Sequence, residues 1–235
     1  MLPLFFSEEL KGEINQYTVL DEDTSRHIVQ VLRMRKAGLL QVTNGNGGLY
    51  TAEIVDDNKK AVKVGINDFR QLEPRQKKTT ICLSLLKNAN RFEWFLEKAT
   101  ELGVFQIIPM ICDRTERQHF RMNRMRNILV SAMLQSRQCW LPDLPGPQPF
   151  QQIVEEARQE QKMIAHCIDE KKLSVAQAMN KNVSSYIMLV GPEGDFTQQE
   201  VAFAIEAGFV GTSLGETRLR SETAALVAAT IIQLA

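Results

Sequence analysis

The sequence predicts an α/β protein with a small β-rich N-terminal part and a larger part in which strands and helices alternate. Short strand patterns separated by strong turn residues occupy the first seventy residues. Beyond residue 79, apolar runs alternate with segments of helical periodicity, which favours a mainly parallel sheet covered by helices. In the last quarter, two apolar runs each stop at glycine and pass through a polar turn into a helix start. Such turns meet at the carboxyl edge of a sheet, where ligands usually bind.

The N-terminal part contains a clear hairpin. Residues 39–43 and 49–55 read as strands, and the Asn-Gly-Asn-Gly-Gly segment at 44–48 supplies strong turn residues between them. A second turn at 56–58 leads to a strand over 61–66, where apolar residues alternate at strand period. Short strands of this kind around one helix predict a small barrel.

The helix in this part is expected to begin at Asp23 as its N-cap. Ile28, Val31 and Leu32 then fall on one face, which should be buried. Residues 70–78, which are charged and contain Pro74, read as a linker.

The remaining elements follow from apolar runs and helical spacing. Strands are expected over 79–86, 105–112, 163–168 and 185–190, and helices over 92–102, 122–136, 151–160, from 197 and from 221. Gly103 and Gly208 should end two of these helices. Thr197 and Glu200 predict a capping box, with Phe196 and Val201 as a hydrophobic staple.

Composition excludes several classes of protein. No run of about 18 apolar residues predicts a transmembrane helix, and the first residues do not read as a signal peptide, so we expect a cytoplasmic protein. Cys82, Cys112 and Cys167 lie in apolar runs and should be buried, reduced thiols. The three histidines are not near cysteines at ligand spacing, so no metal site is expected.

The net charge of zero conceals a basic middle. Residues 70–137 hold 13 Lys and Arg against 6 Asp and Glu, a net charge of +7. Arginine clusters suit phosphate backbones because the planar guanidinium binds them with two hydrogen bonds. A solvated helix face accounts for the same pattern, and charge alone leaves both interpretations open.

The two glycine turns lack the residues of common phosphate-binding motifs. Residues 187–196 read IMLVGPEGDF and residues 214–224 read LGETRLRSETA, without a Gly-Lys-Ser/Thr ending or a G-x-G-x-x-G pattern. Together they resemble the SPOUT class of RNA methyltransferases and, within it, the ribosomal RNA small subunit methyltransferase E family. Three further segments resemble this family in the same order along the chain: 27–38, 87–109 and 114–136. The resemblance therefore spans nearly the whole sequence.

The resemblance implies a PUA-like β-barrel that binds RNA at residues 1–72 and a SPOUT α/β domain with a deep trefoil knot at residues 73–235. It also implies an S-adenosylmethionine cofactor, a homodimer, and methylation of N3 of a uridine in 16S ribosomal RNA of the small ribosomal subunit. A glycine turn suits this cofactor, because a Cβ would block the close approach of the backbone.

The resemblance also assigns site residues. Those for the cofactor are Leu189, Val190, Gly191, Pro192, Glu193, Gly194, Leu214, Gly215, Arg218, Leu219 and Arg220. Those for catalysis are Arg220, Arg218 and Glu193, and those for RNA are Arg33, Arg91, Arg114, Arg117, Arg121 and Arg124. Of Arg218 and Arg220, one is expected to face the cofactor or RNA and the other to pair with Glu222 or Glu193. For Glu193, a role as a capping residue is favoured over a role as a proton acceptor.

One residue departs from the family pattern. Asp195 stands where the family usually has a second glycine, and aspartate tolerates the left-handed conformation better than most residues. Its charge leaves cofactor affinity open. The alternatives are a SPOUT enzyme for another RNA or for a ribose 2′-hydroxyl, and a non-catalytic RNA-binding protein of ribosome assembly.

Overall fold

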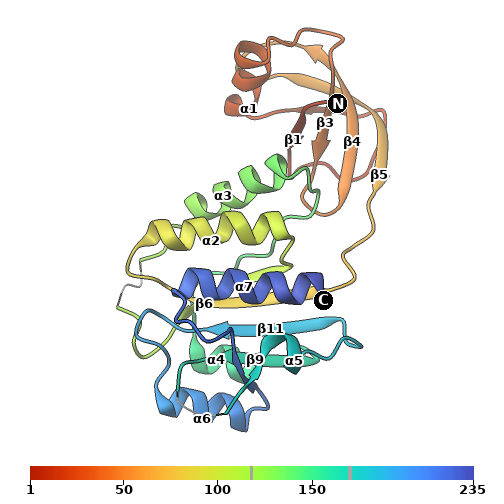
Figure 1. The fold of residues 1–235 in the computed structure, drawn as a ribbon. Coiled ribbons are helices and arrows are strands. Elements are labelled where there is room, and N and C mark those ends of the chain that lie inside the picture. The colour runs from red at the N-terminus through yellow and green to blue at the C-terminus, as the bar shows by residue number, and fades with distance from the viewer. Residues whose placement is uncertain (117–118, 169–170) are drawn as a thin grey trace. The chain divides into compact units, whose positions relative to one another are not determined.

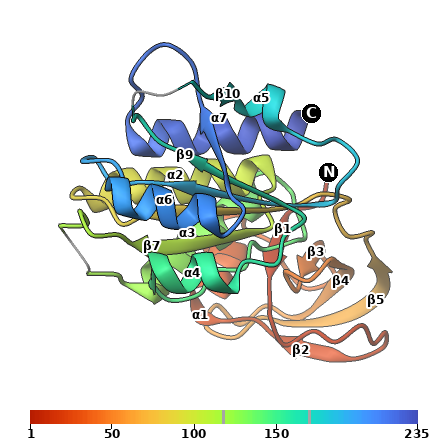
Figure 2. The same cartoon turned by 90° about the horizontal axis from the view of Figure 1, so that it is seen from below.

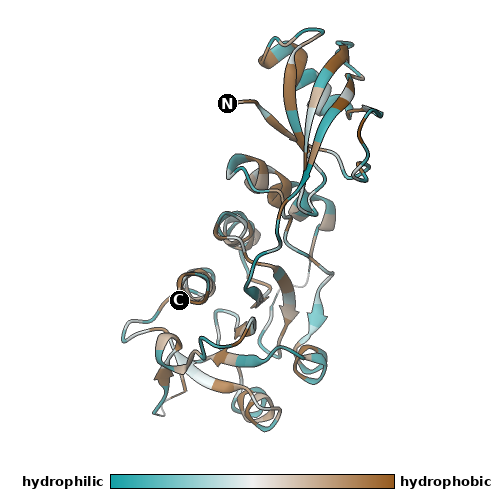
Figure 3. Ribbon diagram, turned by 90° about the vertical axis from the view of Figure 1, so that its right-hand side faces the viewer, coloured by the Kyte–Doolittle hydropathy of each residue, from teal (hydrophilic) through white to brown (hydrophobic). Residues whose placement is uncertain are grey.

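The computed structural model describes residues 1–116, 119–168 and 171–235, and these divide into two compact units. The N-terminal unit comprises Met1–Pro74 and Met133–Leu141, and the C-terminal unit comprises Arg75–Ala132 and Pro142–Ala235. Figure 1 shows the elements of both units, and Figure 3 shows apolar residues along the strands of both sheets.

The N-terminal unit is built on a five-stranded mixed sheet in the order β1-β3-β4-β5-β2. Its strands are β1 (Leu4–Phe6), β2 (Tyr17–Val19), β3 (Leu39–Thr43), β4 (Gly48–Asp56) and β5 (Lys63–Gln71). The β3–β4 hairpin confirms the prediction, whereas β5 starts later and runs further than expected. Only β1 and β3 pair in parallel. The strands bury one apolar cluster, which includes Tyr50, Ile54 and Val64, so the predicted barrel takes the form of a sheet with β1 and β2 at its edges.

The helix of this unit differs from its prediction. The N-cap of α1 (Glu22–Arg26) is Asp21, whose Oδ1 accepts from the Thr24 N–H at 2.9 Å, rather than Asp23. A π-helix, η1 (His27–Val31), follows. Ile28 is buried as expected, but Val31 is 64% and Leu32 is 41% exposed. The π-turn bonds residues five apart, so the face calculated from α-helical spacing rotates away from the core.

A distant segment completes the N-terminal unit. The Gly47 N–H donates to the Cys139 carbonyl at 2.8 Å, and the Trp140 Nε1–H donates to the Glu73 carbonyl at 3.2 Å. Gly47 has φ +81°, and a Cβ there would lie 2.3 Å from the Trp140 ring. Trp140 therefore packs on the hairpin turn.

The C-terminal unit contains a parallel seven-stranded sheet in the order β10-β12-β9-β11-β6-β7-β8. Its strands are β6 (Lys78–Ser84), β7 (Gln106–Ile111), β8 (Gln148–Pro149), β9 (Gln161–Ala165), β10 (Leu173–Ser174), β11 (Ser185–Val190) and β12 (Val210–Ser213). Four of these were predicted. β8 and β10 have two residues each, too few for a periodic signal, and β12 was predicted only as the run before the second glycine turn, without bounds.

Helices cover both faces of this sheet. The helices are α2 (Ala89–Leu102), α3 (Met122–Gln135), α4 (Phe150–Glu156), α5 (Val175–Ala178), α6 (Gln198–Glu206) and α7 (Ser221–Leu234), of which α3 belongs to the N-terminal unit from Met133 on. In Figure 1 and Figure 2, α7 lies beside α2 on one face, and α4 and α6 lie on the other. The capping box at Thr197 and Glu200 and the Gly103 end of α2 are confirmed. The helix predicted over 151–160 ends at Glu156, because Ala157 takes an extended conformation.

The prediction for the cysteines is partly wrong. Cys82 and Cys112 are buried, but Cys167 is exposed because β9 ends at Ala165 and the chain has already left the sheet. Burial raises the pKa of the Cys82 and Cys112 thiols, which keeps both neutral.

Candidate functional site

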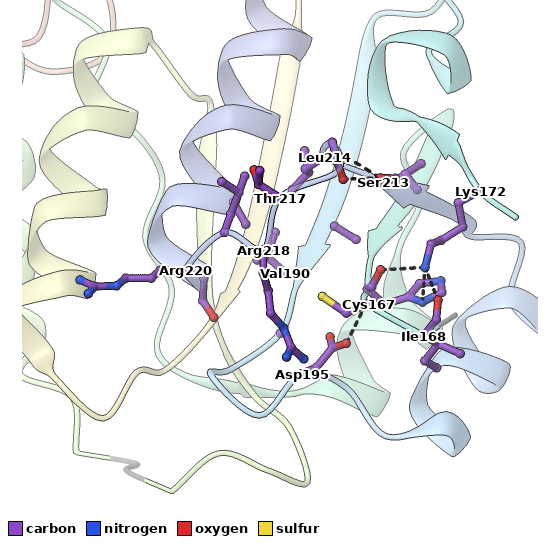
Figure 4. Close-up of a pocket in the computed structure, with 18 of the residues that line it drawn as sticks. Cys167, Ile168, Lys172, Val190, Asp195, Ser213, Leu214, Thr217, Arg218 and Arg220 are labelled. Carbon is purple, nitrogen blue, oxygen red and sulfur yellow. Dashed lines mark hydrogen bonds between the residues drawn. The ribbon is translucent and has the colours of Figure 1, made fainter. Parts of the chain in front are cut away.

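One cavity of about 810 Å³ lies in the C-terminal unit, where loops leave three neighbouring strands (Figure 4). The strands are β9, β11 and β12, which pair in parallel. Parallel neighbours end at the same edge, so the segments after Ala165, Val190 and Ser213 meet there. This is the edge at which the sequence placed the two glycine turns.

The turn formed by residues 191–195, after β11, is tightly packed at its start. Gly191 and Pro192 are buried. A Cβ at Gly191 would lie 3.1 Å from the Phe196 backbone nitrogen and from its ring, and Phe196 is itself only 2% exposed. A side chain at position 191 would therefore fit only if Phe196 moved by a few tenths of an ångström.

Hydrogen bonds from other parts of the unit hold this turn. Glu193 Oε1 accepts from the Lys87 N–H at 3.1 Å, and Arg114 Nη1 donates to the Gly194 carbonyl at 2.7 Å. Glu193 thus binds a backbone donor, as expected of a cap.

Asp195 ties the turn to the segment after β9. It has φ +61°, and its Oδ2 accepts from the Cys167 N–H at 2.7 Å (Figure 4). Aspartate keeps this left-handed position at small cost because a short polar side chain can bond locally. The turn is therefore formed with Asp195 in place of a second glycine.

The loop of residues 214–220, after β12, is more open. Gly215 has φ +122° with no atom within 4 Å of an added Cβ, and its N–H donates to Ser213 Oγ at 3.3 Å. Arg218 and Arg220 are exposed, and both line the cavity. Figure 4 shows Arg218 pointing toward Asp195 and Arg220 extending away from it.

The prediction that Arg218 or Arg220 pairs with Glu222 or Glu193 is wrong: among the residues that the structure describes, Glu222 pairs with another arginine. Glu222 is 6% exposed, and its Oε1 lies 3.6 Å from Nε of Arg91 on α2. Among the residues that the structure describes, Glu222 Oε2 has no hydrogen-bond partner. Arg91 reaches Glu222 because α2 packs beside α7, a contact that the sequence does not reveal.

Most of the predicted cofactor residues line the cavity: Val190, Gly191, Pro192, Glu193, Leu214, Gly215, Arg218, Leu219 and Arg220. Leu189 does not, because it is fully buried in the core below α4 and α6. Gly194 is exposed and does not line the cavity either.

Sequence reasoning missed the third wall of the cavity, which includes His166, Cys167 and Lys172. Lys172 Nζ donates to the carbonyls of His166 and Ile168 and so holds this segment together. The signal was available, because β9 was predicted as a buried strand of the same parallel sheet and its carboxyl end had to face the same edge.

The candidate RNA-binding arginines are not equivalent. Arg114 binds the 191–195 turn, and Arg91 pairs with Glu222. Arg124 donates two hydrogen bonds to Glu93, at 2.6 and 2.8 Å, and lowers the pKa of that carboxyl. Arg33 is exposed with φ +54°, and Arg121 is exposed with its Nε donating to His119. Arg117 lies outside the described residues.

In the described ranges 1–116, 119–168 and 171–235, no helix has the length and apolar character needed to cross a membrane. Groups of three or more His, Cys, Asp or Glu side chains that could hold a metal ion are absent from the same ranges.

The sequence matches two family models. Residues 73–233 match the model described as an RNA methyltransferase domain, and residues 20–67 match the model of an RNA methyltransferase PUA domain.

Curated relatives and a solved structure that resemble this chain are also RNA methyltransferases by name. The ribosomal RNA small subunit methyltransferase E of Synechocystis is 29% identical over 222 residues, covering 92% of this chain and 73% of that protein. The protein of that name from Bacillus subtilis is 25% identical, covering 97% and 94%. The structure of the Neisseria gonorrhoeae protein of that name, bound to S-adenosyl methionine, has a TM-score of 0.88 at 28% identity and covers 100% of this chain and 98% of that one.

Proposed function

The chain belongs to the RNA methyltransferase family, and on this premise we propose that it transfers a methyl group from S-adenosylmethionine to N3 of a uridine in 16S ribosomal RNA. The observation that carries the proposal is the cavity at the carboxyl edge of the parallel sheet, bordered by two glycine turns. Relatives named ribosomal RNA small subunit methyltransferase E support the choice of RNA.

The residues of the cavity fit this cofactor. Its volume of about 810 Å³ lies within the range of ligand pockets, roughly 300–1,000 Å³. At Gly215 the backbone is open to the cavity where a Cβ would stand, so a ring can approach the chain closely. The residues that would hold the cofactor are those predicted residues that line the cavity, and Asp195 adds a carboxylate suited to a positively charged ligand. S-adenosylmethionine supplies an activated methyl group on a positively charged sulfur.

The protein's task is then alignment and the management of charge. N3 of uridine carries a proton that passes to a general base or to water before or as N3 attacks the methyl carbon, and negative charge develops on the uracil ring as the proton leaves. Arg218 and Arg220 border the cavity with exposed guanidinium groups that stabilise this charge. Glu193 acts by holding the turn, since its carboxylate binds the Lys87 N–H.

Finer parts of the proposal rest on the family resemblance. Residues 1–72 form a PUA-like RNA-binding domain, a division supported by the match of residues 20–67 to a PUA model. Residues 73–235 form a SPOUT domain with a trefoil knot, which acts as a homodimer in the cytoplasm. Arg33 and Arg121, which are exposed, contact RNA phosphates.

The test is methyl transfer followed by nucleoside analysis. The purified protein is incubated with labelled S-adenosylmethionine and either free 16S RNA or 30S particles, and the digested RNA is separated by chromatography. We expect the label in N3-methyluridine. Label in a 2′-O-methyl nucleoside would contradict the N3 assignment, and no transfer to either substrate would contradict the function.

A further inference from the structure

Among the carboxylates of the cavity wall that the structure describes, Asp195 is the one that is half-buried. Its Oδ2 is fixed by the Cys167 N–H at 2.7 Å. The exposed charged residues of the cavity wall are Glu193, Glu216, Arg218 and Arg220. Water screens exposed charges strongly, so Asp195 contributes more to the field inside the cavity than they do.

No cation neutralises this carboxylate within the described part of the chain. Arg218 points toward Asp195 in Figure 4, but no hydrogen bond joins the two side chains. The Lys172 ammonium, which also borders the cavity, donates to the carbonyls of His166 and Ile168. The negative charge of Asp195 is therefore available to a ligand.

Building on the proposed function, we infer that Asp195 makes the cavity select S-adenosylmethionine over S-adenosylhomocysteine by charge. The two molecules share every group except one methyl and the positive charge that it places on sulfur. Treated as a sphere, the cavity is roughly 12 Å across, so a charge within it lies in Coulombic range of its wall. A half-buried carboxylate there attracts the charged molecule and has little effect on the sulfur of the neutral one.

This selection has a consequence for turnover. Methyl transfer breaks the bond from sulfur to the methyl carbon, whose electron pair stays on sulfur, and the positive charge disappears. The attraction by Asp195 therefore ends when the product forms. The same carboxylate that raises affinity for the substrate leaves the product less tightly held and so limits product inhibition.

The chain offers a closely matched variant. In Asp195→Asn the amide oxygen still accepts from the Cys167 N–H, and asparagine also tolerates positive φ. Only the charge is lost. Calorimetric titration with each molecule should show the dissociation constant of S-adenosylmethionine rising about tenfold, while that of S-adenosylhomocysteine changes less than about twofold.

Two further variants separate charge from bracing. Glu216→Gln removes an exposed carboxylate from the same cavity wall and should leave the affinity ratio within about twofold. Asp195→Gly suits the left-handed turn but removes both charge and hydrogen bond, so it should lower the ratio as Asp195→Asn does and weaken both ligands as well. In the wild type, the ratio should also fall as salt concentration rises.

The outcomes distinguish this inference from the proposed function. Wild-type binding of S-adenosylmethionine with an unchanged ratio in Asp195→Asn overturns the charge selection and leaves Asp195 a brace. A wild type that binds neither molecule overturns the cofactor assignment itself. Thermal melting of each variant checks that the fold is intact.

Discussion

The 191–195 turn and the 214–220 loop border the same cavity but are held in different ways. Arg114, Lys87 and Cys167, from three separate parts of the chain, bond the 191–195 turn. In the described structure, the hydrogen bonds between the 214–220 loop and a side chain are the two that join Gly215 to the hydroxyl of the neighbouring Ser213. Four of its residues in a row, 215–218, are exposed.

The difference suggests a division of labour. A turn fixed by distant bonds offers a rigid surface on which a ligand loses little additional freedom. A loop with few bonds can adjust to a bound molecule and bring its arginines to the reacting base. Changes in the first region should therefore alter stability and affinity, and changes in the second should alter activity.

The largest effect is expected for Arg220→Ala. Because Arg220 is exposed, its loss should leave the melting temperature unchanged, whereas removal of a charge that stabilises the transition state should lower methyl transfer about 100-fold or more. Transfer to 16S RNA or 30S particles measures this, with circular dichroism as the check on folding. Unaltered turnover would show that the 214–220 loop does not supply this charge.

Gly191→Ala and Gly215→Ala each add one Cβ, the first to the 191–195 turn and the second to the 214–220 loop. Alanine at 191 meets Phe196 at 3.1 Å in a packed turn, and such overpacking costs about 1–3 kcal/mol. Alanine at 215 meets no atom within 4 Å but is strained at φ +122°. We expect a loop held by few bonds to shift and relieve that strain. Thermal melting should therefore show a larger loss for Gly191→Ala than for Gly215→Ala. The reverse order would mean that the 214–220 loop is the more rigid of the two.

Much of this site follows from the sequence. The strand at 185–190, the capping box at Thr197 and the glycines of both turns are local signals, and the structure has them where they were predicted. The edge on which the turns meet also follows, because parallel strands end together.

The partners of the charged side chains could not be predicted. Arg91 binds Glu222 from 131 positions away, and Arg114 reaches Gly194 across 80 positions. Both were expected to bind RNA, because a basic cluster looks the same in sequence whether its arginines face solvent or brace the protein. The predicted buried face of the first helix was partly wrong for a different reason, because the periodicity of apolar residues does not reveal a π-turn.

The smallest predicted effect is a change in melting temperature in Arg114→Ala, for which Arg218→Ala is the control. Arg114 donates to the Gly194 carbonyl at 2.7 Å from an exposed position, so its loss should cost about 1 kcal/mol and lower the melting temperature by about 2–4 °C. Cofactor affinity should fall with it, because the turn loses a support. Arg218 makes no such bond in the described chain, so Arg218→Ala should leave the melting temperature within about 1 °C. If the two variants melt alike, Arg114 does not hold the turn, and the contrast between the two regions would then rest on Glu193 and Asp195.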